Sequence, residues 1–330
     1  MGEATKPGRG LRTWPHLAAR RRRPSEYEIV TTDLHWRTAF AEYSELSPSL
    51  PINQWFRKYV RESPLKHENW DEFRDPDEII YRTYNVMQDG QESYVDGLLD
   101  EHDAIGHDAR LPTAWVDTLA RLYTPARYML HGVQMGSAYL VMTAPASTIT
   151  ACAAFQMGDA LRWVARLAYR TRELANRHAG KGFAEQERQH WEQDAAWQGF
   201  RELIERMLVA YDWGECFVAL NVITKPAIDE AFLRQLASAG RVHGDTLLGL
   251  LADAQLRDSE RSRRWTKALV EFARQHPESG AVLDGWVAKW APLGNQAMET
   301  YTAALPDRGE AGAEAVRAAR AFRADLGFAS

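Results

Sequence analysis

The sequence predicts an all-α protein, a bundle of long helices preceded by an extended N-terminal arm. Three observations predict this fold. Seven of the 14 prolines lie within residues 1–76, apolar residues recur at helical spacing from residue 77 onward, and no clear alternating pattern of a β-hairpin follows. Long helices joined by short connections form bundles. We therefore divide the chain into an arm, 1–76, and a helical domain, 77–330.

The arm is unsuited to long helices, because each proline lacks a backbone N–H and disfavours helical geometry in the residue before it. It is nevertheless rich in aromatic side chains, whereas disordered tails are poor in them. We expect the arm to bury these rings on its own helical domain, on a partner protein, or on both. The aromatic residues are Trp14, Tyr27, Trp36, Tyr43, Trp55, Phe56, Tyr59, Trp70 and Phe73.

Prolines and glycines mark the expected boundaries of the helices in the helical domain. Pro112 and Pro145 stand where helices begin, while Gly180 and Pro277 stand where helices end. Pro125 lies inside an expected helix and should kink or divide it. The expected helices span 77–102, 113–142, 146–178, 196–224, 227–239, 245–276, 280–304 and 312–325.

The composition excludes several classes of protein. A net charge of −5 gives no global basic field that would favour nucleic acid, and no apolar run approaches the ~20 residues of a membrane-spanning helix. Cys152 and Cys216 are isolated thiols, which fit a reducing compartment rather than a disulfide framework. The Arg20–Arg23 run is followed by the polar segment Pro24–Glu28 instead of the apolar core of an export signal. We expect a cytoplasmic protein.

A helix bundle can hold a diiron centre, whose usual ligands include two Glu-x-x-His pairs, because positions i and i+3 share a helix face. Of the ten histidines, only His190 follows a glutamate, Glu187, at that spacing. This pair lies in a polar stretch that is typical of a solvated surface. One such pair could not form a dinuclear site.

The expected inward stripes of four helices carry almost no metal ligands. Glu215 is their single carboxylate, and none of them contains a histidine. A lone buried carboxylate needs a partner, so we expect an ion pair between Glu215 and Arg162 or Arg261. The residues alone therefore predict a bundle without a visible catalytic site. The stripes are Ala153, Gln156, Ala160, Trp163, Leu167; Leu248, Ala252, Gln255, Ser259, Ser262, Thr266, Leu269; Leu130, Gln134, Ser137, Val141; and Ile204, Leu208, Tyr211, Glu215, Val218.

Several long strings resemble the hydroxylase β subunit of toluene-type four-component soluble diiron monooxygenases. They are distributed over residues 12 to 291, nearly the whole chain. The strongest are Tyr81–Val95 and Ser63–Asp71. The others are Arg12–Trp14, Pro24–Tyr27, Ala144–Ile149, Tyr211–Glu215 and Arg264–Val270.

The resemblance implies a ferritin-like fold in which the positions of iron ligands have lost their ligands. Ala160 and Trp163 stand where the iron-binding α subunit has glutamate and histidine. Ser259 and Ser262 replace the second such pair, Ser137 replaces a further glutamate, and only Glu215 is retained. The resemblance therefore implies no catalytic, cofactor-binding or metal-binding residue in this chain. Trp163 is expected to fill the volume of the missing iron site.

The resemblance also implies partners and cofactors. The chain would be a structural subunit, inactive alone, in an (αβγ)2 hydroxylase whose α subunit holds a non-haem diiron centre. The N-terminal arm would lie over α, and the β subunits would help to form the dimer. A Rieske ferredoxin and a flavin reductase would deliver NADH-derived electrons, and a small effector protein would regulate. The substrate would be toluene, benzene, or an alkene such as isoprene or propene.

Two alternatives remain open at this point. The chain could be an independent diiron oxidase that uses atypical ligands, such as Glu215 with Asp258 and Glu260. It could instead be a helical binding module without enzymatic role, in which the Arg20–Arg23 patch contacts an acidic partner.

Overall fold

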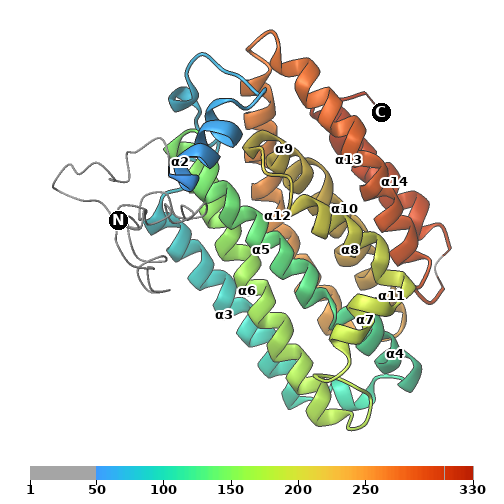
Figure 1. Cartoon of the computed structure of the whole chain (residues 1–330). Helices are drawn as coiled ribbons and strands as arrows, with labels where there is room; N and C mark the ends of the chain where they lie inside the picture. Colours follow the sequence, from blue (N-terminus) through green and yellow to red (C-terminus); the bar gives the residue numbers. More distant parts are fainter. Residues whose placement is uncertain (1–49, 308, 330) are drawn as a thin grey trace, which may run out of the picture. The chain divides into compact units, whose positions relative to one another are not determined.

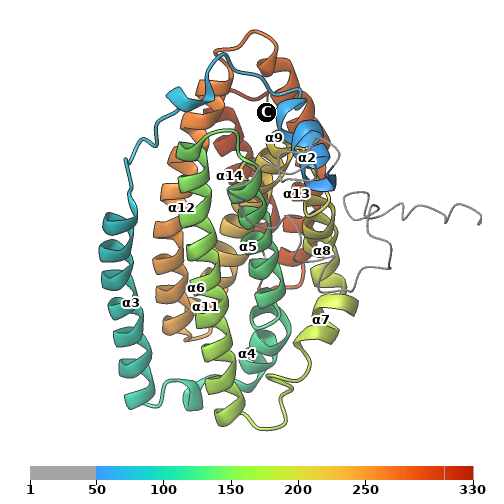
Figure 2. The ribbon, with the colours of Figure 1, turned by 60° about the vertical axis from the view of Figure 1, so that its left-hand side comes forward.

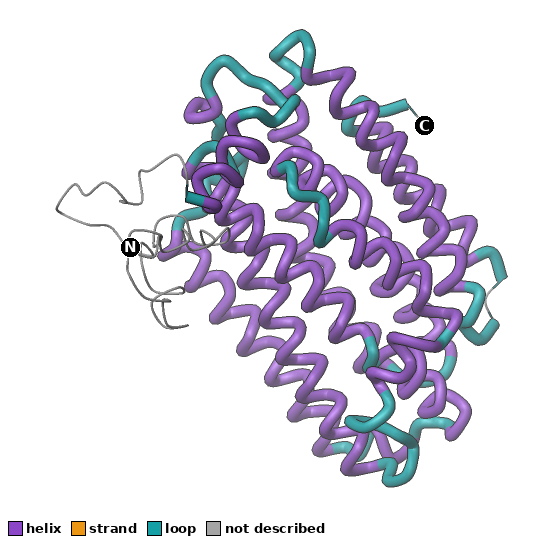
Figure 3. Tube along the Cα trace, viewed as in Figure 1, coloured by secondary structure: helices purple, strands orange, loops and turns teal. Residues whose placement is uncertain are grey.

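The computed structural model describes residues 50–307 and 309–329. The chain divides into two compact units, Met1–Glu62 and Ser63–Ser330. All regular structure in the described residues is helical, without a β-strand (Figures 1 and 3). The predicted all-α class is therefore confirmed.

The described part of the first unit is a short helix. Helix α2 spans Pro51–Phe56 and continues as the π-helical turn Arg57–Arg61. Pro51 occupies the first helical position, where the missing N–H costs nothing. The rings of Trp55 and Tyr59 lie 4.7 Å apart. Most of the predicted arm, including its four arginines at 20–23, lies outside the described residues.

The second unit begins before the boundary that we expected at residue 77, because residues 63–76 already pack on the helices. Leu65 and Phe73 are buried. The His67 ring stacks on Phe272 with the centroids 3.8 Å apart. Each contact joins the segment to helices more than 100 residues away, so this stretch belongs to the helical body.

The first half of the body contains three long helices. The hydroxyl of Thr83 accepts a hydrogen bond from the backbone N–H of Ile80 (3.0 Å), which places the start of the first helix at Tyr81 rather than at 77. Pro125 divides the helix expected over 113–142, as predicted. The elements are α3 (Tyr81–Ala104), η4 (Asp108–Arg110), α4 (Thr113–Thr118), η5 (Leu119–Tyr123), α5 (Ala126–Thr143) and α6 (Ser147–Arg177).

The second half departs from expectation at two places. The helix expected over 196–224 is interrupted, because the Asp212 carboxylate accepts from the backbone N–H of Gly214 (2.9 Å) and begins a new helix. From Trp213 the helical elements then follow one another directly to Val242. They are α7 (Glu187–Gln193), α8 (Ala195–Met207), α9 (Trp213–Phe217), η6 (Val218–Thr224), α10 (Lys225–Ala227), η7 (Ile228–Gln235), α11 (Leu236–Val242), α12 (Thr246–Ala273), α13 (Ser279–Thr302) and α14 (Ala311–Asp325).

Within this unit, α3, α6 and α12 run side by side, and α5 lies along α6 (Figures 1 and 2). The inward stripe predicted on α6, from Ala153 to Leu167, is buried at all its positions. Gln156 and Trp163 of this stripe, together with the nearby Asp159 and Arg162, contact residues of the neighbouring helices and belong to the candidate site. No helix in the described part of the chain combines the length and apolar character needed to cross a bilayer.

Candidate functional site

A neutral polar layer crosses the middle of the bundle. Ser137 (α5), Gln156 (α6), Asn221 (η6) and Thr266 (α12) are all almost fully buried. Gln156 donates to the Ser137 hydroxyl (3.0 Å) and to the Asn221 amide oxygen (3.2 Å). Asn221 donates back to Gln156 (2.9 Å) and to Thr266 Oγ1 (3.0 Å). The layer ties four helices together with amides and hydroxyls, which are poor ligands for iron.

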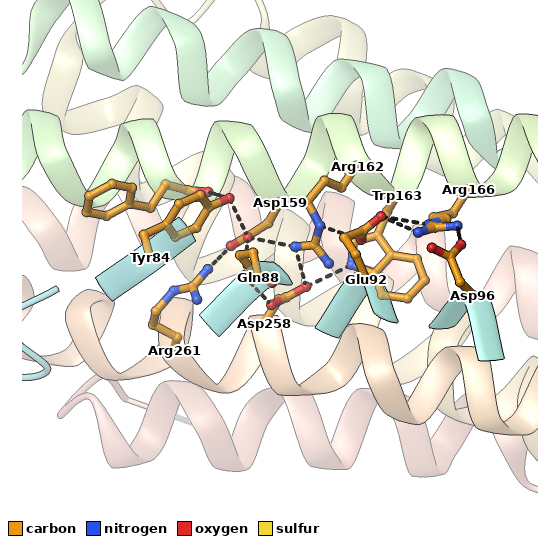
Figure 4. A network of polar contacts seen from close by, with 11 residues as sticks. Tyr84, Gln88, Glu92, Asp96, Asp159, Arg162, Trp163, Arg166, Asp258 and Arg261 are labelled. Carbon is orange, nitrogen blue, oxygen red and sulfur yellow. Dashed lines mark hydrogen bonds and ion pairs between the residues drawn. The ribbon is translucent and has the colours of Figure 1, made fainter. Parts of the chain in front are cut away.

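A charged layer lies beside the neutral layer. It is centred on two buried carboxylates, Asp159 of α6 and Asp258 of α12 (Figure 4). Gln88 of α3 donates from one nitrogen to both, at 2.9 and 3.0 Å. Trp163 Nε1 donates to Asp258 (2.8 Å). Arg162 lies within ion-pair distance of both carboxylates, at 3.2 and 3.4 Å. Donors from α3 and α6 therefore converge on the two acids.

The charged layer continues on either side. On one side, Arg261 forms an ion pair with Asp159, and the Tyr84 hydroxyl donates to the same carboxylate (2.9 Å). On the other side, Glu92 of α3 accepts from Arg162 (2.7 Å) and from Arg166. Figure 4 shows that these contacts form one continuous network between α3, α6 and α12.

Burial sets the acidity of this network. Desolvation, followed by the nearby Asp258 charge, raises the pKa of Asp159 to about 6, although Arg261 and Arg162 oppose the shift. Burial and the Asp159 charge also raise the pKa of Tyr84 well above its usual value. Tyr84 therefore keeps its proton and donates it in the hydrogen bond to Asp159, whereas Asp159 is mainly ionised near neutral pH, as its ion pairs with Arg261 and Arg162 require.

A third cluster surrounds Asp229 of η7. Its carboxylate accepts from the Ser259 hydroxyl (2.7 Å) and from Arg263 (2.9 Å). Arg263 also donates to Glu230 (2.8 Å). Between this cluster and the charged layer lies a cavity of about 30 Å³, and Lys225 is among the residues that line it.

The structure separates the residues that the sequence singled out. Ala160, Trp163 and Ser259 line the same cavity. Ser137 belongs instead to the neutral layer. Ser262 lies at the same layer, because its backbone oxygen accepts a hydrogen bond from the Thr266 hydroxyl (2.6 Å). The two groups of residues thus lie in adjoining layers.

Glu215 is not where the sequence pattern placed it, and its predicted ion pair with Arg162 or Arg261 is wrong. Because α9 begins at Trp213, Glu215 lies in the first turn and faces α13. Its carboxylate accepts from Lys289 Nζ (2.5 Å) and Trp290 Nε1 (3.0 Å). The inward position on this element is occupied by Asn221, which the sequence reading missed. The N-cap pattern Asp-x-Gly-Glu at residues 212–215 was the signal that could have revealed the shift.

The Glu187–His190 pair was also misjudged. Glu187 is buried, not solvated, because its carboxylate accepts from the backbone N–H of Ala184 (2.6 Å). Ala184 has a positive φ of 65°, a strained conformation that this hydrogen bond helps to hold. His190 lies 3.6 Å from Asp194 instead. Glu187 therefore secures the loop before α7, whereas His190 contacts the residue that follows this helix.

A further buried cluster, absent from the sequence reading, lies at the end of the bundle where α3 ends. Arg170 forms a two-pronged ion pair with Asp108. Asp245 accepts from His107 (3.2 Å) and Trp115 Nε1 (3.0 Å). Burial opposes ionisation of Asp245, but the hydrogen bond from His107 and the Arg170 charge outweigh it and lower its pKa. The cluster fastens the η4 loop to α6 and α12.

The donors proposed for an independent oxidase are not brought together. Asp258 belongs to the charged layer, Glu215 faces α13, and Glu260 is exposed. Across residues 50–307 and 309–329, no three or more histidine, cysteine, aspartate or glutamate side chains are grouped so that they could hold a metal ion. This geometry gives the oxidase alternative no support.

Comparison with known proteins places this arrangement in a family. Residues 55–277 match the model of the methane/phenol/alkene hydroxylase family. The chain is 49% identical over 304 residues to the β subunit of the hydroxylase component of the toluene-4-monooxygenase system of Ectopseudomonas mendocina, covering 92% of each chain.

Two solved structures also match the fold of this chain. A structure of toluene 4-monooxygenase with toluene in its resting active site matches with a TM-score of 0.77 and 49% identity, covering 91% of this chain and 98% of that chain. Xenon-pressurised phenol hydroxylase from Pseudomonas sp. OX1 shares the fold, with a TM-score of 0.77 at 20% identity, covering 100% of this chain and 98% of that one. The resemblance seen in the sequence is confirmed: the chain belongs to the methane/phenol/alkene hydroxylase family.

Proposed function

We propose that this chain is the non-catalytic, structural β subunit of the hydroxylase of a multicomponent diiron monooxygenase. The observation that carries the proposal is the 49% identity, over 92% of both chains, to a hydroxylase β subunit. The buried layers support it, because the carboxylates between the helices are bound to arginines, a tryptophan and a glutamine of the chain itself.

The residues at the centre of the bundle do not fit a diiron site. Iron of this type needs several carboxylates and imidazoles with free lone pairs. Here Ala160 and Trp163 supply no ligand, and Trp163 donates a hydrogen to Asp258 (2.8 Å). We therefore assign iron and the activation of dioxygen to a partner α subunit, in an (αβγ)2 assembly that also contains a small γ subunit. A Rieske ferredoxin, a flavin reductase and an effector protein would serve it.

The proposed substrate is a small hydrocarbon, either an aromatic compound such as toluene or benzene, or an alkene such as isoprene or propene. This chain contributes the scaffold that supports α, and the part of the expected arm that precedes the helical body, residues 1–62, extends the contact with α. We place the assembly in the cytoplasm, where the free, buried Cys152 and Cys216 would stay reduced.

The test is purification of the tagged chain from its native host, with the mass and the iron content of every associated chain. We expect two further subunits and iron on the larger of them, whereas the separated chain holds no stoichiometric iron and is poorly soluble. Two irons per chain, or oxygen-dependent turnover by the chain alone, would overturn the proposal.

The arm offers a second test, because the binding-module alternative depends on Arg20–Arg23. Replacement of all four arginines by alanine should weaken the assembly only slightly if the chain is a structural subunit with a large interface. Complete loss of partner binding would favour the binding module instead.

A further inference from the structure

The outward face of the α5–α6 pair lacks charge. Residues 128–158, between Arg127 and Asp159, contain no aspartate, glutamate, lysine or arginine. The whole chain is 26% charged, so a stretch of this length at average composition would hold about eight charged residues. The two helices lie side by side (Figures 1 and 2), and the absence of charge is therefore concentrated on one pair of neighbouring helices.

Part of this uncharged surface faces away from the core. On each helix, exposed or half-buried positions recur every three, four or seven residues and so lie along one outward stripe. Met142 is 47% exposed and Leu161 is 54% exposed. From Tyr128 onward α5 has no charged side chain on any face, which is typical of a helix buried within a larger structure. The stripes are His131, Met135, Ala138 and Met142 on α5, and Ala154, Leu161, Ala165 and Ala168 on α6.

The face is large enough to bind another protein. Helix α5 has 18 residues and is about 27 Å long at about 1.5 Å per residue. Two packed helices are about 20 Å across, so the face covers on the order of 500 Å². Contiguous apolar patches larger than a few hundred Å² mark interaction sites on soluble proteins.

Two arginines lie at one end of this face. Because α5 and α6 are antiparallel, the start of α5 and the second half of α6 lie at the same end of the pair (Figure 2). Arg127 is half-buried and Arg172 is exposed. Arg127 donates to the Tyr128 hydroxyl (3.2 Å), and neither arginine forms an ion pair within residues 50–307 and 309–329. A partner that covers the face can supply their carboxylates.

A second copy of this chain does not meet that requirement through the same face. Helix α5 has no carboxylate, and those of α6 are bound within the chain. Asp159 pairs with Arg261, and Glu173 lies 3.6 Å from Arg170. Two copies joined here would leave the arginines at the end of each face without counter-ions from α5 or α6. A different chain with carboxylates at that end is the better electrostatic match.

We propose that the α5–α6 face binds a different subunit, which presents an uncharged helical face and places carboxylates opposite Arg127 and Arg172. The alanines of the α6 stripe, which have no side chain beyond Cβ, allow a partner helix to approach closely. The inference rests on the proposed function, in which this subunit is the iron-containing α subunit. It adds that the helical body, and not only the N-terminal arm, carries the contact.

The first test is photo-crosslinking in the assembled hydroxylase. The photoreactive residue p-benzoylphenylalanine replaces Leu161 or Met142, and mass spectrometry identifies the chain that is captured on irradiation. We expect both positions to cross-link to the iron-containing subunit. The matched control is Ala324 of α14, an exposed position next to Asp325, which should not cross-link to that subunit.

The second test introduces charge at the same face. Leu161→Glu should raise the dissociation constant of the assembly on the order of 100-fold, since it buries an unpaired carboxylate in the contact. Arg172→Glu should raise it about 10-fold, and Ala324→Glu should leave it unchanged. Dissociation is followed on dilution by mass photometry. Equal protease resistance of the three variants shows that the chain itself remains folded.

Cross-links from Leu161 and Met142 to a second copy of this chain or to its own residues 1–62, or no cross-links at all, would overturn the inference. Unchanged dissociation of the Leu161→Glu assembly would do the same. Each of these results leaves the proposed function intact as long as the wild-type chain co-purifies with an iron-containing subunit. Failure of that co-purification would instead count against the proposed function.

Discussion

Gly199 sits where two helices touch, and its replacement by alanine should destabilise the fold. A Cβ at this position would lie 2.7 Å from Ala297 Cα and 3.2 Å from Ala297 N, both backbone atoms of α13. Ordinary contacts between carbon atoms are about 3.5–4.0 Å, so α8 and α13 would have to separate by about 1 Å. Unlike the end of a flexible side chain, the backbone atoms of Ala297 cannot rotate away from the added Cβ. We expect the cost to be at the upper end of the ~1–3 kcal/mol typical of overpacking.

Helix propensity acts in the opposite direction, because alanine is favoured over glycine in a helix by about 1 kcal/mol. The expected net loss for Gly199→Ala is therefore about 2 kcal/mol. Gly97 of α3 supplies the matched control, since its added Cβ would meet nothing within 4 Å. Gly97→Ala should gain about 1 kcal/mol from propensity alone.

Pulse proteolysis in urea, read for this chain by mass, measures both changes whether or not partner subunits are present. With a slope of about 3 kcal/mol per molar urea, the midpoint should fall by about 0.7 M for Gly199→Ala and rise by about 0.3 M for Gly97→Ala. Equal shifts in the two variants would refute the reasoning, because the packing of α8 on α13 would then play no part.

Three further predictions follow from the buried polar groups. Asn221→Leu removes one hydrogen-bond partner each from Gln156 and Thr266 and should cost about 2–3 kcal/mol in the same assay. Asn221→Leu combined with Gln156→Met should recover part of the loss. The pKa of Asp159 is raised to about 6 from 3.8, so between about pH 4 and 6 the folded chain holds a proton that the unfolded chain releases. Stability should therefore fall as the pH rises through this window, and Asp159→Asn should flatten the fall; an unchanged slope would contradict the assignment. Burial raises the pKa of Cys216 to about 12, so iodoacetamide should label this thiol only after unfolding, as followed by mass spectrometry.

Most of the fold was predictable because helical periodicity and proline positions act locally. Pro125 divides a helix where expected, and the boundaries of α6 agree within a residue. The predicted break between the helices 196–224 and 227–239 was wrong. Pro226 suggested a break, but local signals do not reveal that the helical elements continue from Trp213 to Val242. The packing of Leu65 and Phe73 on distant helices was equally invisible to local pattern.

The candidate site was predictable only in part. The periodicity of α6 correctly brought Gln156 and Trp163 to the interior. The periodicity could not identify the hydrogen-bond partners of these two residues. Asn221 and Asp258 come from other helices, and the rotation of those helices about their axes depends on packing. Glu215 illustrates the failure: the cap at Asp212 restarts the helix, so that the stripe counted from Ile204 no longer applies.

The π-helical turns of η6 and η7 also bear on how this sequence can change. A π turn accommodates an additional residue within an α-helix, and the two turns lie in a run, residues 216–233, that is almost wholly buried. Deletion of one residue from a π turn would convert it to an α turn of about 3.6 residues, so the two ends of the run would stay close to their present register. Asn221 and Asp229, each bonded to another helix, could then both keep their contacts. The π turns are therefore places where this buried run could lose a residue without losing its contacts to other helices.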